Sequence, residues 1–249
     1  MDKLNQLKKL LTDTSAVQLI EDDIYSVLVD VAARHHYDRR ATVYDMVVGT
    51  RVYNSVMWGS APLDYIAFAR QAVSSSGRGM ALDAACGSML FTASTYVQSA
   101  RPIVALDQSL AMLRRARRRL IVLSGRVPEQ VLFLQANLND LPFRKAGFQT
   151  VLCMNVLHQF ENASVLIPAL EDMLTEGGQL YLTSLVLNNR LIGDTYLKVL
   201  HAIREFVRPR SNLELRNMLE GSLSQEVNYR VNGNMAFAST SLPGVVPDN

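Results

Sequence analysis

Residues 80–92 read Met-Ala-Leu-Asp-Ala-Ala-Cys-Gly-Ser-Met-Leu-Phe-Thr. This order predicts a short apolar strand that ends in an acid, Asp83, followed by a tight turn of small residues and then by a helix. Small residues in such a turn let main-chain N–H groups come close to a ligand. The stretch therefore predicts a ligand site at the carboxyl end of a buried strand.

A second strand that ends in an acid follows about twenty residues later. Residues 103–107 read Ile-Val-Ala-Leu-Asp, and an acid at this place in a parallel sheet holds a nucleotide ribose through its hydroxyls. The turn after Asp83 lacks the pattern Gly-x-Gly-x-x-Gly, which a dinucleotide needs for the close approach of its pyrophosphate. The two strands together predict an adenosine-type cofactor without a pyrophosphate, such as one with a methionine tail and a sulfonium.

Four segments resemble, in order and spacing, the motifs of class I S-adenosylmethionine-dependent methyltransferases. They are residues 80–92, 107–113, 135–143 and 148–160, and the first resembles the family's Leu-Asp-x-Gly-Cys-Gly-Thr-Gly. The resemblance covers about residues 60–240. It implies an α/β fold with a doubly wound, Rossmann-like sheet of seven strands whose last strand is antiparallel. It also implies S-adenosyl-L-methionine as the cofactor and S-adenosyl-L-homocysteine as its product.

The resemblance also implies a set of cofactor-binding residues. They are Asp83, Ala85, Gly87, Asp107, Gln108, Met112, Asn137, Leu138 and Asn155, with Tyr44 from the N-terminal region. Ala85 and Met89 stand where the family usually has glycines; alanine fits if its φ is negative, and methionine can turn away from the cofactor. Asn137 replaces an aspartate that often accepts a hydrogen bond from adenine, and an amide oxygen accepts the same bond without charge assistance. Ala85 and Met89 support an alternative, a protein of this fold that does not transfer methyl groups and acts as a binding partner or in non-methylating chemistry.

The chain divides into three parts. Its 249 residues, 49% of them apolar, suffice for one domain with an N-terminal elaboration. We expect a helical cap or lid at 1–60, the methyltransferase domain at 61–240 and a loose tail at 241–249. Strands are expected near 79–84, 102–106, 130–135, 148–154, 178–185, 224–231 and 234–239, the last two joined by an Asn-Gly turn. Helices are expected at 1–11, 22–33, 88–99, 109–123, 163–175 and 191–207.

The N-terminal part contains aromatic residues interleaved with small and polar ones. It resembles the lid-like segment of ubiquinone- and menaquinone-type C-methyltransferases. The resemblance makes Tyr37, Tyr53 and Trp58 candidate lid and substrate residues, and implies a small organic acceptor of apolar or aromatic character. In the alternative interpretation, these aromatic rings simply pack on the sheet.

His158 is the candidate for proton transfer. It follows the fourth predicted strand at the carboxyl edge, where it could deprotonate an acceptor hydroxyl; a packing or hydrogen-bonding role is the alternative. We expect no metal site, because the adjacent His35 and His36 lack partner ligands at suitable spacing. The arginines between 114 and 119 are expected to form the solvated face of a helix rather than an RNA-binding surface.

Charge and cysteine content suggest a location and exclude some partners. The net charge of +2 gives no reason to expect a nucleic-acid partner, and no apolar stretch is long enough for a membrane span. Cys86 and Cys153 are expected to be reduced thiols in a cytoplasmic protein. The acceptor atom and the oligomeric state stay open at this point.

Overall fold

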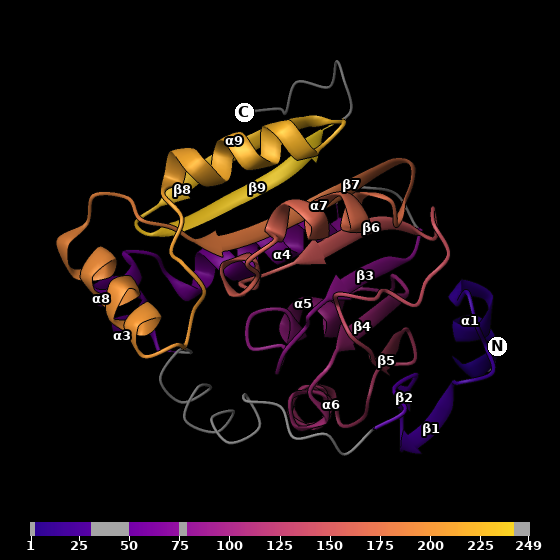
Figure 1. The fold of residues 1–249 in the computed structure, drawn as a ribbon. Coiled ribbons are helices and arrows are strands. Elements are labelled where there is room, and N and C mark those ends of the chain that lie inside the picture. Colours follow the sequence, from indigo (N-terminus) through magenta and orange to yellow (C-terminus); the bar gives the residue numbers. More distant parts are fainter. Residues whose placement is uncertain (1–2, 31–49, 75–78, 242–249) are drawn as a thin grey trace.

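The structure, a computed structural model, describes residues 3–30, 50–74 and 79–241. In these residues one sheet of nine strands runs in the order β1-β2-β5-β4-β3-β6-β7-β9-β8, with helices on both faces (Figure 1). The strands are β1 Gln18–Glu21, β2 Ile24–Ser26, β3 Ala81–Ala84, β4 Ile103–Asp107, β5 Val131–Gln135, β6 Phe148–Cys153, β7 Leu174–Leu185, β8 Glu226–Asn232 and β9 Met235–Ser241. In this spatial order, the seven strands β5-β4-β3-β6-β7-β9-β8 form the expected sheet. The strands β1 and β2 extend it beyond β5.

Helical segments connect and cover these strands. They are α1 Lys3–Leu10, α3 Arg51–Tyr53, η2 Asn54–Trp58, α4 Pro62–Ser74, α5 Ala93–Gln98, α6 Leu110–Ser124, η3 Leu157–Gln159, α7 Ala163–Glu171, α8 Leu191–Ala202 and α9 Asn212–Ser222. Apolar side chains of α1, α7 and α9 pack on one face of the sheet, and those of α4, α5 and α6 pack on the other. Among the described residues, no helix is both long enough and apolar enough to cross a membrane.

The central strands are parallel and buried, which places the acids together. Leu82 of β3 pairs with Val104 of β4 and with Val151 of β6. Continuous apolar runs suit strands that are covered on both faces. Because these strands run the same way, Asp83 and Asp107 both lie near the carboxyl edge of the sheet.

The N-terminal residues belong to the sheet domain, so the expected helix over 22–33 is wrong. β1 and β2 form an antiparallel hairpin that turns through Asp23, whose φ is 65°. β2 then pairs in parallel with β5, where Ile24 lies opposite Phe133. The expected first helix is confirmed as α1, and its Leu7 is buried in the core. Residues 3–26 therefore complete the sheet rather than cap it.

The C-terminal elements confirm the expected hairpin and add a helix. β8 and β9 pair around the Asn232-Gly233 turn, and β9 runs antiparallel to β7. The helix α9 was not expected from the sequence, although the Ser211 hydroxyl caps it by accepting from the Glu214 N–H. The predicted tail beyond residue 241 lies outside the described residues.

Candidate cofactor site

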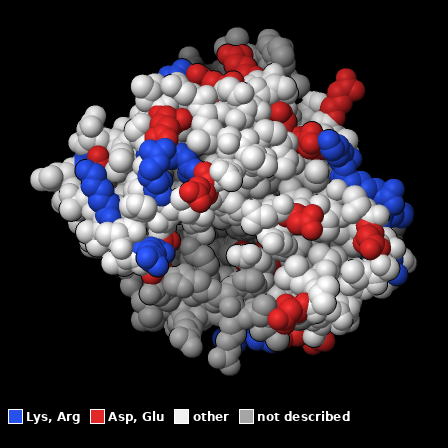
Figure 2. All heavy atoms as spheres, in the orientation of Figure 1, with Lys and Arg blue, Asp and Glu red and all other residues white. Residues whose placement is uncertain are grey.

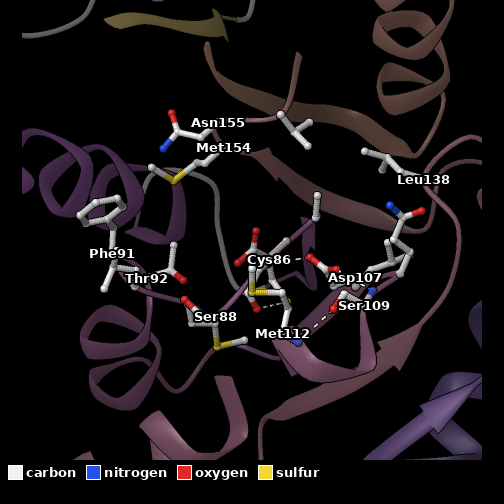
Figure 3. Close-up of a pocket in the computed structure, with 18 of the residues that line it drawn as sticks. Cys86, Ser88, Phe91, Thr92, Asp107, Ser109, Met112, Leu138, Met154 and Asn155 are labelled. Carbon is white, nitrogen blue, oxygen red and sulfur yellow. Dashed lines mark hydrogen bonds between the residues drawn. The ribbon is translucent and has the colours of Figure 1, made fainter. Parts of the chain in front are cut away.

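A cavity opens at the carboxyl edge of the sheet, among the ends of β3, β4 and β6 (Figure 3). Eight of the residues predicted to bind a cofactor line it: Asp83, Ala85, Gly87, Asp107, Gln108, Met112, Leu138 and Asn155. Figure 3 shows Phe91, Met154 and Asn155 on one side of the cavity and Asp107 and Leu138 on the other. The fold thus brings four sequence segments together around one space.

Asp107 organises the loops on its side of the cavity. Its Oδ2 accepts a hydrogen bond from the Gly87 N–H at 2.8 Å, and its Oδ1 accepts one from the Ser109 N–H at 2.9 Å. The Ser109 hydroxyl in turn caps α6 by accepting from the Met112 N–H. One carboxylate therefore links the turn after β3 to the start of α6.

The turn after β3 is strained, because Ala85 does not have the negative φ under which an alanine fits there. Its φ is 65° rather than negative, and Met89 follows with a φ of 54°. L-residues pay about 1–2 kcal/mol in this left-handed region, which glycine adopts freely. Met89 is 1% exposed and packs in the apolar cluster beneath the turn, although it also borders the cavity. Gly87, at φ 52°, is the one position in the turn where the sequence supplies glycine.

We expect Ala85→Gly to raise the free energy of unfolding by up to about 1 kcal/mol, because relief of the left-handed strain outweighs the added freedom of the unfolded chain. Urea denaturation would measure the change. Ala84→Gly is the matched control, since Ala84 is buried within β3 and a glycine there should destabilise by roughly 0.5–1 kcal/mol. Equal destabilisation by both variants would contradict the strain at Ala85.

Asp83 is buried against a phenol at the bottom of the cavity. The Tyr96 hydroxyl donates to its Oδ2 at 2.7 Å. The pKa of Asp83 is raised to about 7, mainly by burial; the Tyr96 hydrogen bond acts to lower this pKa, and the Asp107 charge acts to raise it. Near neutral pH this carboxyl therefore titrates, unlike an ordinary surface aspartate.

The structure does not bring every predicted binding residue to the cavity. Asn137 is not among the residues that line it, and its Oδ1 accepts from the Asn139 N–H at 2.9 Å. Tyr37 and Tyr44 lie outside the described residues. Sequence reasoning missed several lining residues, among them Ser88, Phe91, Thr92, Met154 and Phe160. Phe91 and Thr92 stand directly after the small-residue turn, and this position was the available signal.

Tyr53 and Trp58 do not line the cavity, although they belong to the same apolar cluster as Phe91 and Met154, which do. Trp58 is 4% exposed, and its ring centroid lies 6.0 Å from that of Tyr53 and 5.4 Å from that of Tyr196 on α8. The main chain of this segment is held as well, because the Asn234 N–H donates to the Trp58 carbonyl. These contacts favour the alternative interpretation, in which the aromatic rings pack against the fold.

The surroundings of His158 favour packing over proton transfer. The ring is buried, does not border the cavity, and lies edge-on to Phe206 with centroids 4.4 Å apart. Its Nδ1 accepts from the Leu185 N–H at 3.5 Å. Burial and the nearby Arg210 charge lower the pKa of His158 to about 3, which makes it a weak base.

The arginine run on α6 does more than face solvent. Arg119 donates from Nε to the Ser88 carbonyl at 3.0 Å, so it supports the turn beside the cavity. Arg114 pairs with Glu21 of the N-terminal hairpin. Within the described ranges, no cluster of three or more His, Cys, Asp or Glu residues could hold a metal ion.

Comparison with known proteins agrees with this geometry. Residues 82–182 match the family of the methyltransferase domain. No curated protein matches the chain. Among solved structures, an O-methyltransferase family protein from Burkholderia thailandensis is 14% identical, with a TM-score of 0.64 over 83% of this chain and 60% of that one.

Two further solved structures contain small molecules. An O-methyltransferase family 2 protein from Planctomyces limnophilus, in complex with apigenin, is 21% identical, with a TM-score of 0.59 over 84% of this chain and 62% of that one. A geranyl diphosphate methyltransferase, in complex with GPP and sinefungin, is 14% identical, with a TM-score of 0.56 over 72% of this chain and 76% of that one. At these identities the structural likeness establishes the shared fold.

Proposed function

The chain carries a class I S-adenosylmethionine-dependent methyltransferase domain, and from this premise we propose that it methylates a small organic acceptor of largely apolar or aromatic character. The observation that carries the proposal is the cavity at the carboxyl edge of the sheet, with Asp83 and Asp107 on either side of the turn after β3. Ligands of open α/β sheets bind at this edge.

The residues of the cavity fit the cofactor. A Cβ added at Gly87 would meet no atom within 4 Å, so the backbone there borders open space that a ligand can occupy. Asp107 offers a carboxylate for the ribose hydroxyls, while Gln108 and Leu138 border the place expected for the adenine. Bound in this way, S-adenosyl-L-methionine supplies a methyl group that is attached to a positively charged sulfur.

The opposite side of the cavity suits an apolar acceptor. Phe91 and Met154 lie there, and Val156 and Phe160 also line the cavity. Apolar walls exclude water and hold a flat or branched substrate in one orientation, which is how positioning lowers a barrier. None of the described residues that line the cavity is a histidine, and we propose that positioning contributes more than proton removal by a side chain.

Two further observations support a small-molecule acceptor. Structural neighbours of this chain contain apigenin or GPP, which are small organic molecules with large apolar parts. On the face drawn in Figure 2, basic and acidic side chains are interspersed rather than gathered into the basic patch that nucleic acid requires. We also propose a cytoplasmic location, because Cys86 and Cys153 are both buried and free.

Calorimetric titration with S-adenosyl-L-homocysteine tests the cofactor site directly. We expect saturable binding with one site per chain. Transfer of labelled methyl groups to a panel of phenols, quinols and isoprenoid alcohols then tests the acceptor class. Binding without transfer to any panel member would favour the alternative, in which the domain binds cofactor but acts as a binding partner or in other chemistry.

We further propose that the segment before α4, which ends in η2, closes over the site. We therefore expect S-adenosyl-L-homocysteine to shift the fluorescence of Trp58, the only tryptophan in the chain. The indole is packed between Tyr53 and Tyr196, so a small displacement of η2 against α8 changes its surroundings. Protease cleavage between about residues 35 and 60 should slow in parallel.

Asp107→Ala is the control for this closure, because weakened ligand binding should remove both responses. Unchanged fluorescence and cleavage at saturating ligand would contradict closure. The acceptor site would then be bounded by the loops after β6 and β7.

A further inference from the structure

A phenol and a carboxyl group form a buried pair at the cofactor cavity. Tyr96 of α5 is 1% exposed and Asp83 at the end of β3 is 2% exposed, yet Asp83 also borders the cavity. The Tyr96 hydroxyl donates to Asp83 Oδ2 at 2.7 Å. The main chain of Tyr96 is held as well, because the Gln130 side chain donates to the Tyr96 carbonyl. The hydroxyl is therefore held rigidly against one oxygen of the carboxyl group.

The surroundings of this pair are short of positive charge. From β4 the Asp107 carboxylate faces Asp83, and from β6 the Cys153 thiol lies near it. The Cys86 thiol in the turn after β3 and Thr92 before α5 also lie near Asp83. Among the described residues, no Arg, Lys or His is one of the groups that shift the pKa of Asp83. A cation that enters the cavity would therefore supply the charge that the ionised carboxylate lacks.

We propose that Tyr96 is a positioning residue for the cofactor. Its hydroxyl fixes the Asp83 carboxylate and favours the ionised form, so that the carboxylate can receive the positively charged amino group at the methionine end of the cofactor. The inference rests on the proposed function, because it takes the cavity to be the cofactor site. Asp107 is assigned to the ribose, so Asp83 is the acid that remains for the other end of the ligand. Tyr96 does not line the cavity, and its hydroxyl acts through the carboxylate to which it donates.

The protonation of Asp83 links this arrangement to pH. Burial raises its pKa to about 7 and the Tyr96 hydrogen bond opposes that rise. Below pH 7 the free protein holds this carboxyl protonated, and a bound ammonium must displace the proton. Affinity for S-adenosyl-L-homocysteine, which carries the amino group but no sulfonium, is therefore expected to fall as the pH drops from 7 to 5.

The test is the pH profile of S-adenosyl-L-homocysteine affinity from pH 5 to 8 in Tyr96→Phe. Loss of a hydrogen bond to a charged acceptor should move the midpoint upward by about one pH unit or more. At pH 6 the variant should then bind roughly tenfold more weakly than the native protein. Tyr181→Phe is the matched control, because Tyr181 is equally buried but its hydroxyl bonds to Gln179, away from the cavity. The control should keep the native midpoint.

Asp83→Asn completes the test, including the case in which Tyr96→Phe does not fold. Its affinity should be weak and flat between pH 5 and 8, and adding Tyr96→Phe to it should change the profile no further. A native midpoint in folded Tyr96→Phe, or a pH dependence that survives in Asp83→Asn, would overturn the role of Tyr96. Absence of binding by the native protein at every pH would instead count against the proposed function.

Discussion

Replacement of Asp107 by alanine (Asp107→Ala) is expected to weaken S-adenosyl-L-homocysteine binding by about tenfold to a hundredfold. The carboxylate accepts from the Gly87 and Ser109 N–H groups, and it is the acid that we propose binds the ribose hydroxyls. A hydrogen bond to a charged group contributes about 1.5–3 kcal/mol, and every 1.4 kcal/mol is roughly a factor of ten in affinity. Calorimetry at constant pH would measure the loss.

Asp140→Ala is the matched control for Asp107→Ala. It removes the same charge from an exposed position near the cavity without removing a lining side chain. Its affinity should stay within about twofold of the native value, because exposed charges are screened. Native affinity in a folded Asp107→Ala protein would remove the ribose role from this residue.

Arg210→Met is expected to lower the free energy of unfolding by about 3–5 kcal/mol. The guanidinium is buried and donates to three carbonyls, those of Leu157, Phe160 and Glu161. Methionine has similar length but no donor, so all three acceptors would lose this partner together. Because Phe160 lines the cavity, cofactor affinity should fall as well. Urea denaturation and calorimetry would measure the two effects.

Arg208→Met separates this effect from the general loss of an arginine. Arg208 is exposed and pairs with Glu214 at the surface, where an ion pair contributes about 0–1 kcal/mol. If both variants lose the same stability, the bonds from Arg210 do not hold the loop after β6. In Arg210→Met the pKa of His158 should also rise, because the Arg210 charge acts to lower it. Proton NMR of the ring would follow that change.

The central sheet could be predicted because strands that are buried on both faces have continuous apolar sequences. β4, β5 and β6 are short apolar runs, and each lies within one residue of its expected bounds. The helix after β3 was expected at 88 but begins at Ala93, because Met89 adopts a left-handed conformation that interrupts it. The pattern of apolar residues does not predict a left-handed backbone conformation at one residue.

The N-terminal hairpin could not be predicted from periodicity alone. Ile24, Val27, Leu28 and Val31 fit a helical spacing, yet residues 24–26 are all buried because β2 pairs with a strand more than a hundred residues away. The missed helix α9 did carry a local signal. Ser211 and Glu214 form the Ser-x-x-Glu pattern that begins many helices.

Site residues were predictable where a motif fixed their position along a strand end. Asp83, Gly87 and Asp107 all reach the cavity for this reason. Tyr96 was not predictable, because its hydroxyl reaches Asp83 only through the packing of α5 on the sheet. His158 stood at the right sheet edge, but its ring lies against Phe206 rather than in the cavity. The sequence predicts the place of a residue in the fold, whereas packing determines the direction of its side chain.

The pairing of β2 with β5 also sets an order of assembly during synthesis. The hairpin leaves the ribosome before its partner strand, which ends at Gln135, and Leu11 also bridges to the later residue Phe143. At the usual rate of translation the first strands therefore wait on the order of ten seconds for the residues that they pair with. Until then the edge of β2 that pairs with β5 has no neighbour. The hairpin of β1 and β2 is thus made before β5 but joins the sheet only after β5 has emerged.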